Sequence, residues 1–236
     1  MEPQQNIQPV IENDIQQEST QFMTKVFGWM CAGLAMTGVT AYYVSVSPAL
    51  AHFFIGQQAT FYALLIIELL AVIFLTRGVG HMSARQAGGV FLLYSLLNGL
   101  TFSVIFLIYD ISSIGRVFAI TAGTFGAMAL YGYVTKRDLT TVGNLAFFGL
   151  IGLVIASITN LFIQSTRADL ILAYIGVAIF VALTAYDVQK IKNMNIIGNA
   201  GTDQDKKESI MGALTLYLDF INLFLKLLRI LGKRRS

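Results

Sequence analysis

Seven long apolar runs place the strongest constraint on how this chain can fold. A helix needs about 20 predominantly apolar residues to cross the hydrocarbon core of a bilayer. Runs of that kind lie near residues 26–46, 58–76, 87–109, 116–134, 144–164, 169–188 and 210–231. They are continuously apolar, whereas the strands of a membrane β-barrel alternate between apolar and polar residues. The sequence therefore predicts an all-α membrane protein, in which residues 22–236 form one seven-helix transmembrane bundle.

The composition supports a membrane protein and excludes several other classes. Only 12% of the residues are charged, against about 25% in soluble domains. The net charge of +3 is too small to indicate a nucleic-acid partner. The single cysteine, Cys31, excludes an internal disulfide or a CxxC site, and His52 and His81 fall in predicted loops. No P-loop, HExxH or GxSxG motif is present, so we expect neither an enzyme nor an organic cofactor.

The loops predict how the chain is oriented in the membrane. Residues 1–21 are rich in glutamine and lack the apolar core of an export signal, so we interpret them as a disordered tail. Lys and Arg concentrate in cytoplasmic loops. A cytoplasmic N-terminus leaves only Arg116 and Arg167 in the outside loops before the last helix. The inside loops then hold Lys25, Arg77, Arg85, Lys136, Arg137, Lys190, Lys192, Lys206 and Lys207.

The last apolar segment departs from this charge pattern. A full seventh span would place Lys233, Arg234 and Arg235 outside. The sequence leaves two alternatives open: the charge rule is overridden at the end of the chain, or the last segment is re-entrant and both termini are cytoplasmic. The polar loop 189–209 before this segment is the predicted hinge of the chain.

A polar stripe runs along the same last segment. Its members follow one another at spacings of three and four residues, which places them on one face of a helix. They are Gly212, Thr215, Asp219, Asn222, Lys226, Arg229 and Lys233. A carboxylate at mid-bilayer depth is costly, so this stripe must face protein or water. We favour a helix packed inside the bundle, and the alternative is an amphipathic helix at the membrane surface.

Two further carboxylates lie within apolar segments. Asp187 is close to the predicted cytoplasmic end of the sixth span, whereas Asp219 lies two or more turns inside the seventh. A contact between them therefore requires helix tilt or a longer sixth helix, and Asp187 could instead be solvated at its helix end. Glu68 and Arg77 fall on opposite sides of the second span, so each needs a partner on another helix.

Four stretches of the sequence together resemble the Bax inhibitor-1 family, also called the transmembrane Bax inhibitor motif family. They are FGWMCAGLAMTG (27–38), AGTFGAMALYGYVTKRDLTTVGN (122–144), LTAYDVQKIK (183–192) and GALTLYLDFINLFLKLLRIL (212–231). The resemblance runs from about residue 20 to the C-terminus and is to the bacterial inner-membrane branch. It implies a bundle with a central C-terminal helix ringed by the other six and a multi-pass protein of the inner membrane, while the cytoplasmic N-terminus is predicted from the loop charges.

The resemblance also implies roles for particular residues. Asp187 and Asp219 match a pair of aspartates that forms a hydrogen-bonded, pH-sensing dyad. Arg77 is the candidate latch on that dyad, and Glu68 matches a carboxylate of the second helix. We add Asn222 on the polar stripe as a pore candidate. The family is associated with calcium leak and, in one bacterial branch, with restraint of a membrane-bound protease.

These features lead to one main hypothesis and two alternatives. Two carboxylates in a low dielectric share a proton and titrate in two separate steps, and calcium prefers their oxygen atoms as ligands. We therefore expect a monomeric, pH-sensitive calcium leak channel gated by Asp187 and Asp219, which would also contact the ion. The alternatives are an interaction protein that regulates a membrane protease, and a proton-coupled solute transporter.

Overall fold

Helices account for almost all of the regular structure. The computed structural model describes residues 7–235, with side chains from Ile15 onward, and within this range seven helices are long and apolar enough to cross a membrane. They are α1 (Ile7–Val46), α3 (Gln58–Gly78), α4 (Ala84–Ile108), α5 (Ile111–Val134), α6 (Thr140–Ile163), α7 (Thr166–Met194) and α8 (Asp203–Leu231). Short connecting helices are α2 (Pro48–Ala51), the π-helix η2 (His52–Gly56) and the 3-10 helix η3 (Val79–His81). The predicted all-α membrane fold is confirmed.

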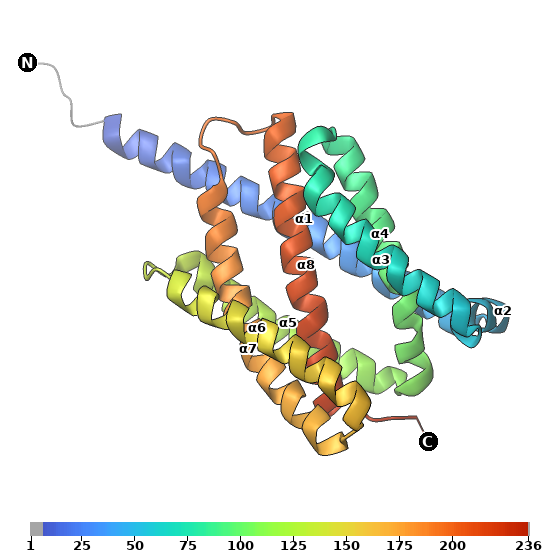
Figure 1. Ribbon diagram of the computed structural model, residues 1–236. Coiled ribbons are helices and arrows are strands. Elements are labelled where there is room, and N and C mark those ends of the chain that lie inside the picture. Colours follow the sequence, from blue (N-terminus) through green and yellow to red (C-terminus); the bar gives the residue numbers. More distant parts are fainter. Residues whose placement is uncertain (1–6, 236) are drawn as a thin grey trace, which may run out of the picture.

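The C-terminal helix α8 lies at the centre of the bundle (Figure 1). Of its most apolar stretch, 67% is buried, whereas no other membrane-length helix of the described chain exceeds 44%. It packs against α1, α4, α5 and α7. The helices α3 and α6 join the bundle mainly through α4 and α7, so α8 is not ringed evenly by six helices. The interpretation of the last segment as a surface helix is wrong.

Small residues allow some of these helices to approach closely. Gly132 of α5 lies against the backbone carbonyl of Ala185 in α7, where any side chain would collide. Gly143 of α6 lies against the ring of Tyr186 in α7 in the same way. Lipid is as apolar as the helix surfaces, so membrane helices associate through this kind of close packing. These contacts hold α5 and α6 on either side of α7.

The chain ends at the face of the bundle opposite to the start of α1 (Figure 1). The backbone N–H of Asp110 donates to the carbonyl of Lys233 at 3.0 Å, and the backbone N–H of Lys233 donates to Ser113 Oγ at 2.8 Å. The end of α8 is thereby attached to the turn between α4 and α5. Because α8 runs the whole length of the bundle, a full seventh span is favoured over a re-entrant segment.

The N-terminal segment differs from the predicted disordered tail. Helix α1 begins at Ile7, so residues 7–21 continue the first span as a helix. Phe22 and Met23 are buried, and both carboxylate oxygens of Glu18 accept from the backbone N–H of Gly198. Tertiary contacts of this kind order a polar helix that the local sequence does not specify. The remainder of the predicted tail, residues 1–6, lies outside the described range.

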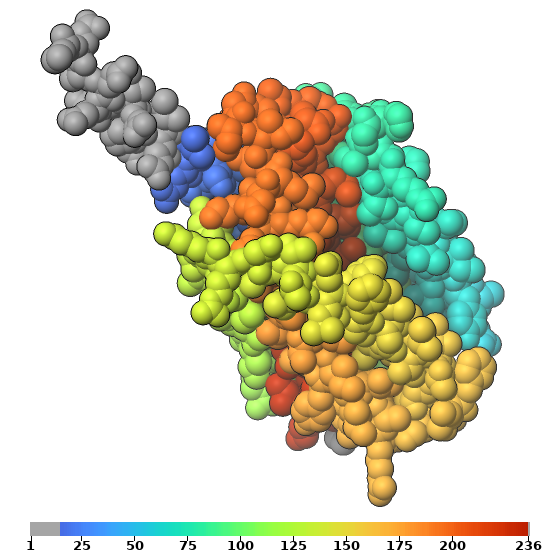
Figure 2. Space-filling view, turned by 60° about the vertical axis from the view of Figure 1, so that its left-hand side comes forward, coloured from blue at the N-terminus to red at the C-terminus, as the bar shows by residue number. Residues whose placement is uncertain are grey.

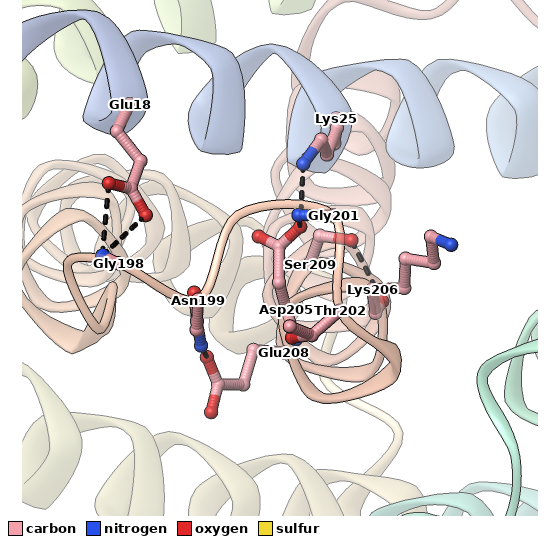
Figure 3. Close-up of polar contacts among 10 residues, drawn as sticks. All are labelled: Glu18, Lys25, Gly198, Asn199, Gly201, Thr202, Asp205, Lys206, Glu208 and Ser209. Atoms are coloured by element: carbon pink, nitrogen blue, oxygen red, sulfur yellow. Dashed lines mark hydrogen bonds and ion pairs between the residues drawn. The ribbon is translucent and has the colours of Figure 1, made fainter. Parts of the chain in front are cut away.

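The predicted hinge is also shorter than expected, because α7 continues to Met194 and α8 begins at Asp203. Only residues 195–202 connect the two helices, and α1 holds this loop (Figure 3). Lys25 of α1 forms an ion pair of 2.6 Å with Asp205, and the same carboxylate oxygen accepts from the backbone N–H of Gly201 at 2.8 Å. Glu18 binds the other side of the loop. The loop is therefore attached to α1 rather than free.

The ion pair between Lys25 and Asp205 makes a first prediction about stability. Asp205 is 1% exposed, so Lys25→Met leaves an almost buried carboxylate without its cation. Breaking a buried pair costs about 3–5 kcal/mol, and the 35% exposure of the Lys25 side chain lowers this cost. We expect a clear fall in the thermal unfolding temperature of the purified protein. Lys207→Met, which breaks the longer and partly exposed pair with Asp203, should cost about 1 kcal/mol or less. Equal effects would contradict the assigned role of Lys25.

The direction of α8 makes a second prediction, about topology. In a Cys31→Ser background, single cysteines at Lys136 and Arg235 should react with a membrane-impermeant maleimide from opposite sides of the membrane. Lys136 follows α5, whereas Arg235 follows α8 at the other end of the bundle. A cysteine at Lys206, in the first turn of α8, should be labelled from the same side as the cysteine at Lys136. Labelling of all three positions from one side would show a re-entrant last segment.

Candidate functional site

Asp187 of α7 and Asp219 of α8 are neighbours, with their carboxyl groups close enough to interact. Asp219 is 6% exposed and Asp187 is half-buried. The sixth membrane-length helix, α7, is longer than the predicted span 169–188, and this extra length places Asp187 well inside the bundle. An ionised carboxylate only accepts hydrogen bonds, and Asp219 Oδ2 finds no donor among the described residues. A hydrogen bond across this pair therefore needs one shared proton.

A cavity leads to this pair from the end of the bundle where the α7–α8 loop lies. Its volume is about 360 Å³, and it lies between η3, α7 and α8. Asp187 and Thr215 line it deep in the bundle, while Lys190, Lys207 and Glu208 line it nearer the loop. Asp219 follows Thr215 by one helical turn and lies beyond the cavity. Asp187 therefore separates the cavity from the more deeply buried Asp219.

The polar stripe of α8 faces α7 over most of its length. Gly212 packs against Ile191, and Asp219 meets Asp187. Further along the two antiparallel helices, the aliphatic stem of Lys226 lies against Gly176, where a side chain would come within 2.9 Å of it. The stripe predicted from residue spacing is therefore the contact between the two helices that carry the aspartates.

An ion pair ends this contact at the opposite face of the bundle. Arg229 of α8 pairs with Asp169 in the first turn of α7. Sequence reasoning placed Arg229 on the stripe but missed Asp169. The signal was available, since Asp169 is an acidic residue at a helix start and the antiparallel helix carries a cation at the matching end.

The other predicted site residues lie apart from the aspartate pair. Glu68 on α3 accepts a hydrogen bond from the Thr101 hydroxyl on α4. Asn222 donates to the backbone carbonyl of Leu218 on its own helix at 2.8 Å. Arg77 is exposed at the end of α3 and does not line the cavity beside Asp187. The structure thus brings Asp187 and Asp219 together and leaves Glu68, Asn222 and Arg77 outside their contact.

Sequence reasoning also missed a buried polar cluster around Tyr217. Its hydroxyl lies 2.8 Å from the Thr37 hydroxyl, and Thr37 donates to the carbonyl of Ser95 at 2.8 Å. Tyr217 itself has no exposed surface. The cluster joins α8 to α1 and α4, on the side of α8 away from α7. One side of the central helix is therefore fixed by hydrogen bonds, while the other side carries the carboxyl pair.

The site offers few ligands for a tightly bound metal. Among the described residues, no group of three or more His, Cys, Asp or Glu side chains is close enough to hold an ion. A resident calcium ion takes six to eight oxygen ligands. Two carboxylates and the nearby Thr215 hydroxyl supply only part of that number. The described residues at this site therefore supply fewer oxygen ligands than a resident calcium ion takes.

Comparison with known proteins identifies the family. The family model described as "Inhibitor of apoptosis-promoting Bax1" matches residues 19–236. The chain belongs to the Bax inhibitor-1 family. It is 48% identical to the inner membrane protein YbhL of Escherichia coli strain K12 over 215 residues, which cover 91% of this chain and 92% of that protein. It is 44% identical to the uncharacterized protein RP147 of Rickettsia prowazekii over 219 residues, 92% of this chain and 91% of the relative.

A third relative extends the same similarity to another bacterium. An uncharacterized protein of Borreliella burgdorferi is 42% identical over 216 residues, which cover 92% of this chain and 93% of the relative. The matched range 19–236 begins within α1 and includes all of α3 to α8. The chain is thus a multi-pass membrane protein of the Bax inhibitor-1 family, as the four sequence stretches predicted.

The contact between the two aspartates makes a third prediction. Residues in contact show interaction energies of about 0.5–3 kcal/mol in double-mutant cycles. The effects of Asp187→Asn and Asp219→Asn on thermal stability should therefore be strongly non-additive at neutral pH. The matched cycle of Glu68→Gln with Asp219→Asn should be close to additive, because Glu68 is bound by Thr101 instead. Additivity in the first cycle would contradict the contact.

Proposed function

We propose that this protein is a pH-sensitive calcium leak pathway of the bacterial inner membrane, with a cytoplasmic N-terminus. The contact between the Asp187 and Asp219 carboxyl groups, at the inner end of a cavity, supports this proposal most directly. Similarity to the inner membrane protein YbhL supports the inner-membrane location. The positive-inside distribution of Lys and Arg supports the orientation.

The gate in this proposal is the proton shared by the two aspartates. In a low dielectric, two adjacent carboxylates cannot both ionise cheaply, so one proton binds them to each other. That proton holds α7 against α8. Its loss leaves two negative charges, which repel each other and attract a cation. The closed state is therefore the protonated pair, and opening follows deprotonation.

Calcium is the transported ion in this proposal rather than a resident cofactor. Hard carboxylate oxygens are the ligands that calcium prefers. The ion would enter through the cavity lined by Glu208 and Asp187, pass Asp219 and follow the α7–α8 contact toward Asp169. Four carboxylates thus lie along one route between the two faces of the bundle. The neighbouring cations Lys207 and Arg229 limit the net negative charge along that route.

The contacts of α1 with α8 and with the α7–α8 loop indicate which gate helix moves in this proposal. Lys25 and Glu18 hold the loop that joins the two gate helices. The Tyr217 cluster fixes α8 to α1 and α4. A change in the carboxyl contact is therefore taken up mainly by α7, the one gate helix that this cluster does not tie down.

Calcium flux into liposomes tests the proposal. Full-length protein is reconstituted, and dye-reported calcium entry is measured from pH 5 to pH 8. We expect the flux of the native protein to rise with pH as the shared proton is lost. Asp219→Asn removes the second acid of the pair, so its flux should be nearly independent of pH. Asp138→Asn, in an exposed turn outside the route, should behave as the native protein.

Two outcomes would overturn the proposal. Unchanged flux and pH dependence in Asp219→Asn would remove the pair as the gate. Absence of calcium flux in the folded native protein would favour the alternative of an interaction protein. In that case a variant lacking residues 1–14, which retains Glu18 and its contact with the loop, is the informative test of a tail-dependent partner.

A further inference from the structure

An apolar groove separates α1 from α5 on the membrane-facing side of the bundle. Its volume is about 600 Å³, within the range of about 300–1,000 Å³ that is usual for ligand pockets. Phe27, Met30 and Leu34 line one wall, while Phe125 and Ala129 line the other. Phe220 of the central helix α8 also contributes to the lining. The groove lies between two membrane-length helices, so we expect a lipid acyl chain to occupy it.

A polar pocket of about 260 Å³ lies at one end of this groove. It is formed by the turn between α5 and α6 together with the end of α7, and it contains Lys136, Arg137 and Lys192. Figure 2 shows this turn, in yellow-green, projecting from the surface next to the orange end of α7. The side chain of Gln189 holds the turn in place, accepting from the Leu139 N–H and donating to the Arg137 carbonyl.

One carboxylate shares the pocket with these three cations. Asp138 accepts from both the backbone N–H and the hydroxyl of Thr140, at 2.9 and 2.6 Å. These hydrogen bonds hold the pKa of Asp138 below its usual value, so the group is ionised at neutral pH. Its carboxylate is hydrogen-bonded to Thr140, and the three cations leave the pocket with a net positive charge.

Tyr133 joins the apolar groove to the basic pocket. It lines both of them. Its hydroxyl lies 3.1 Å from the Thr20 hydroxyl of α1, across the end of the groove. Lys192 donates to the Tyr133 backbone carbonyl at 2.8 Å and lies 4.5 Å from the centre of the ring. The apolar lining of the groove thus meets the cationic lining of the pocket at a single residue, Tyr133.

We propose that the α1–α5 groove and the adjoining basic pocket form a binding site for an anionic glycerophospholipid. One acyl chain occupies the groove against Phe125 and Phe220, and the phosphate group lies at Lys136, Arg137 and Lys192. Basic pockets between membrane helices bind anionic headgroups by this charge complementarity. The site is separate from the aspartate pair. Because the lipid bridges α1 and α5, it completes the packing on one side of α8.

Native mass spectrometry of the full-length protein in detergent tests this site. The protein is titrated with phosphatidylglycerol and with phosphatidylcholine of the same acyl chains, and we expect preferential retention of phosphatidylglycerol. Lys136→Gln with Arg137→Gln should weaken phosphatidylglycerol binding about tenfold or more. Arg85→Gln with Lys206→Gln removes two exposed cations near the same face but outside the pocket, and should retain native binding.

A matched glycine pair tests the groove itself. Gly126 lines the groove and Gly123 does not, and both are exposed on α5 with open space around an added side chain. Gly126→Leu should reduce the retention of both lipids, whereas Gly123→Leu should not. Equal retention of the two lipids by the native protein, or equal behaviour of the two glycine variants, would overturn the proposal.

The single cysteine supplies a measurement that needs no substitution. Cys31 is exposed and lines the groove. Phosphatidylglycerol should slow its alkylation by N-ethylmaleimide in the native protein, and this protection should be lost in the Lys136→Gln, Arg137→Gln double variant. An alkylation rate that does not change with phosphatidylglycerol would place the lipid elsewhere.

Discussion

The contact between Asp187 and Asp219 requires the central helix to face α7 with one particular side. A carboxylate on a membrane helix must meet protein or water, because hydrocarbon offers it no partner. Asp219 meets this condition at α7, which supplies Asp187. The rest of the polar stripe then follows the same line, with Gly212 at one end and Arg229 at the other. One pair of acids therefore sets the rotation of α8 about its own axis.

Opposite this contact, α8 is held by ordinary packing and by the Tyr217 cluster. Tyr217, Thr37 and Ser95 connect three helices through buried hydrogen bonds. The carboxyl contact has a different character, since it depends on a proton that can leave. In the proposed mechanism, a rigid side and a titratable side on one helix act as a switch, because the titratable side changes while the bundle remains folded.

Much of this arrangement could be predicted from the sequence, and the reasons differ from element to element. The seven spans are visible because hydrocarbon imposes a minimum length of apolar residues. The buried face of α8 is visible because polar residues recur at helical spacing. Thr101 could not be predicted as the partner of Glu68, since nothing local marks a contact between distant helices. The pairing of Asp187 with Asp219 came from a family resemblance, not from spacing.

The boundaries of the polar segments could not be predicted either, because they also depend on contacts between distant parts of the chain. Residues 7–21 and most of the predicted hinge are helical, although their composition is typical of loops. Contacts with other parts of the chain, such as Glu18 with Gly198 and Lys25 with Asp205, stabilise these helical segments. The sequence by itself determined the membrane class, the number of spans and the polar face of α8, because these depend on periodicity and on the cost of polar groups in lipid. Only the tertiary structure decided which residues meet, because contacts between helices depend on tilt, rotation and length, which no single helix specifies.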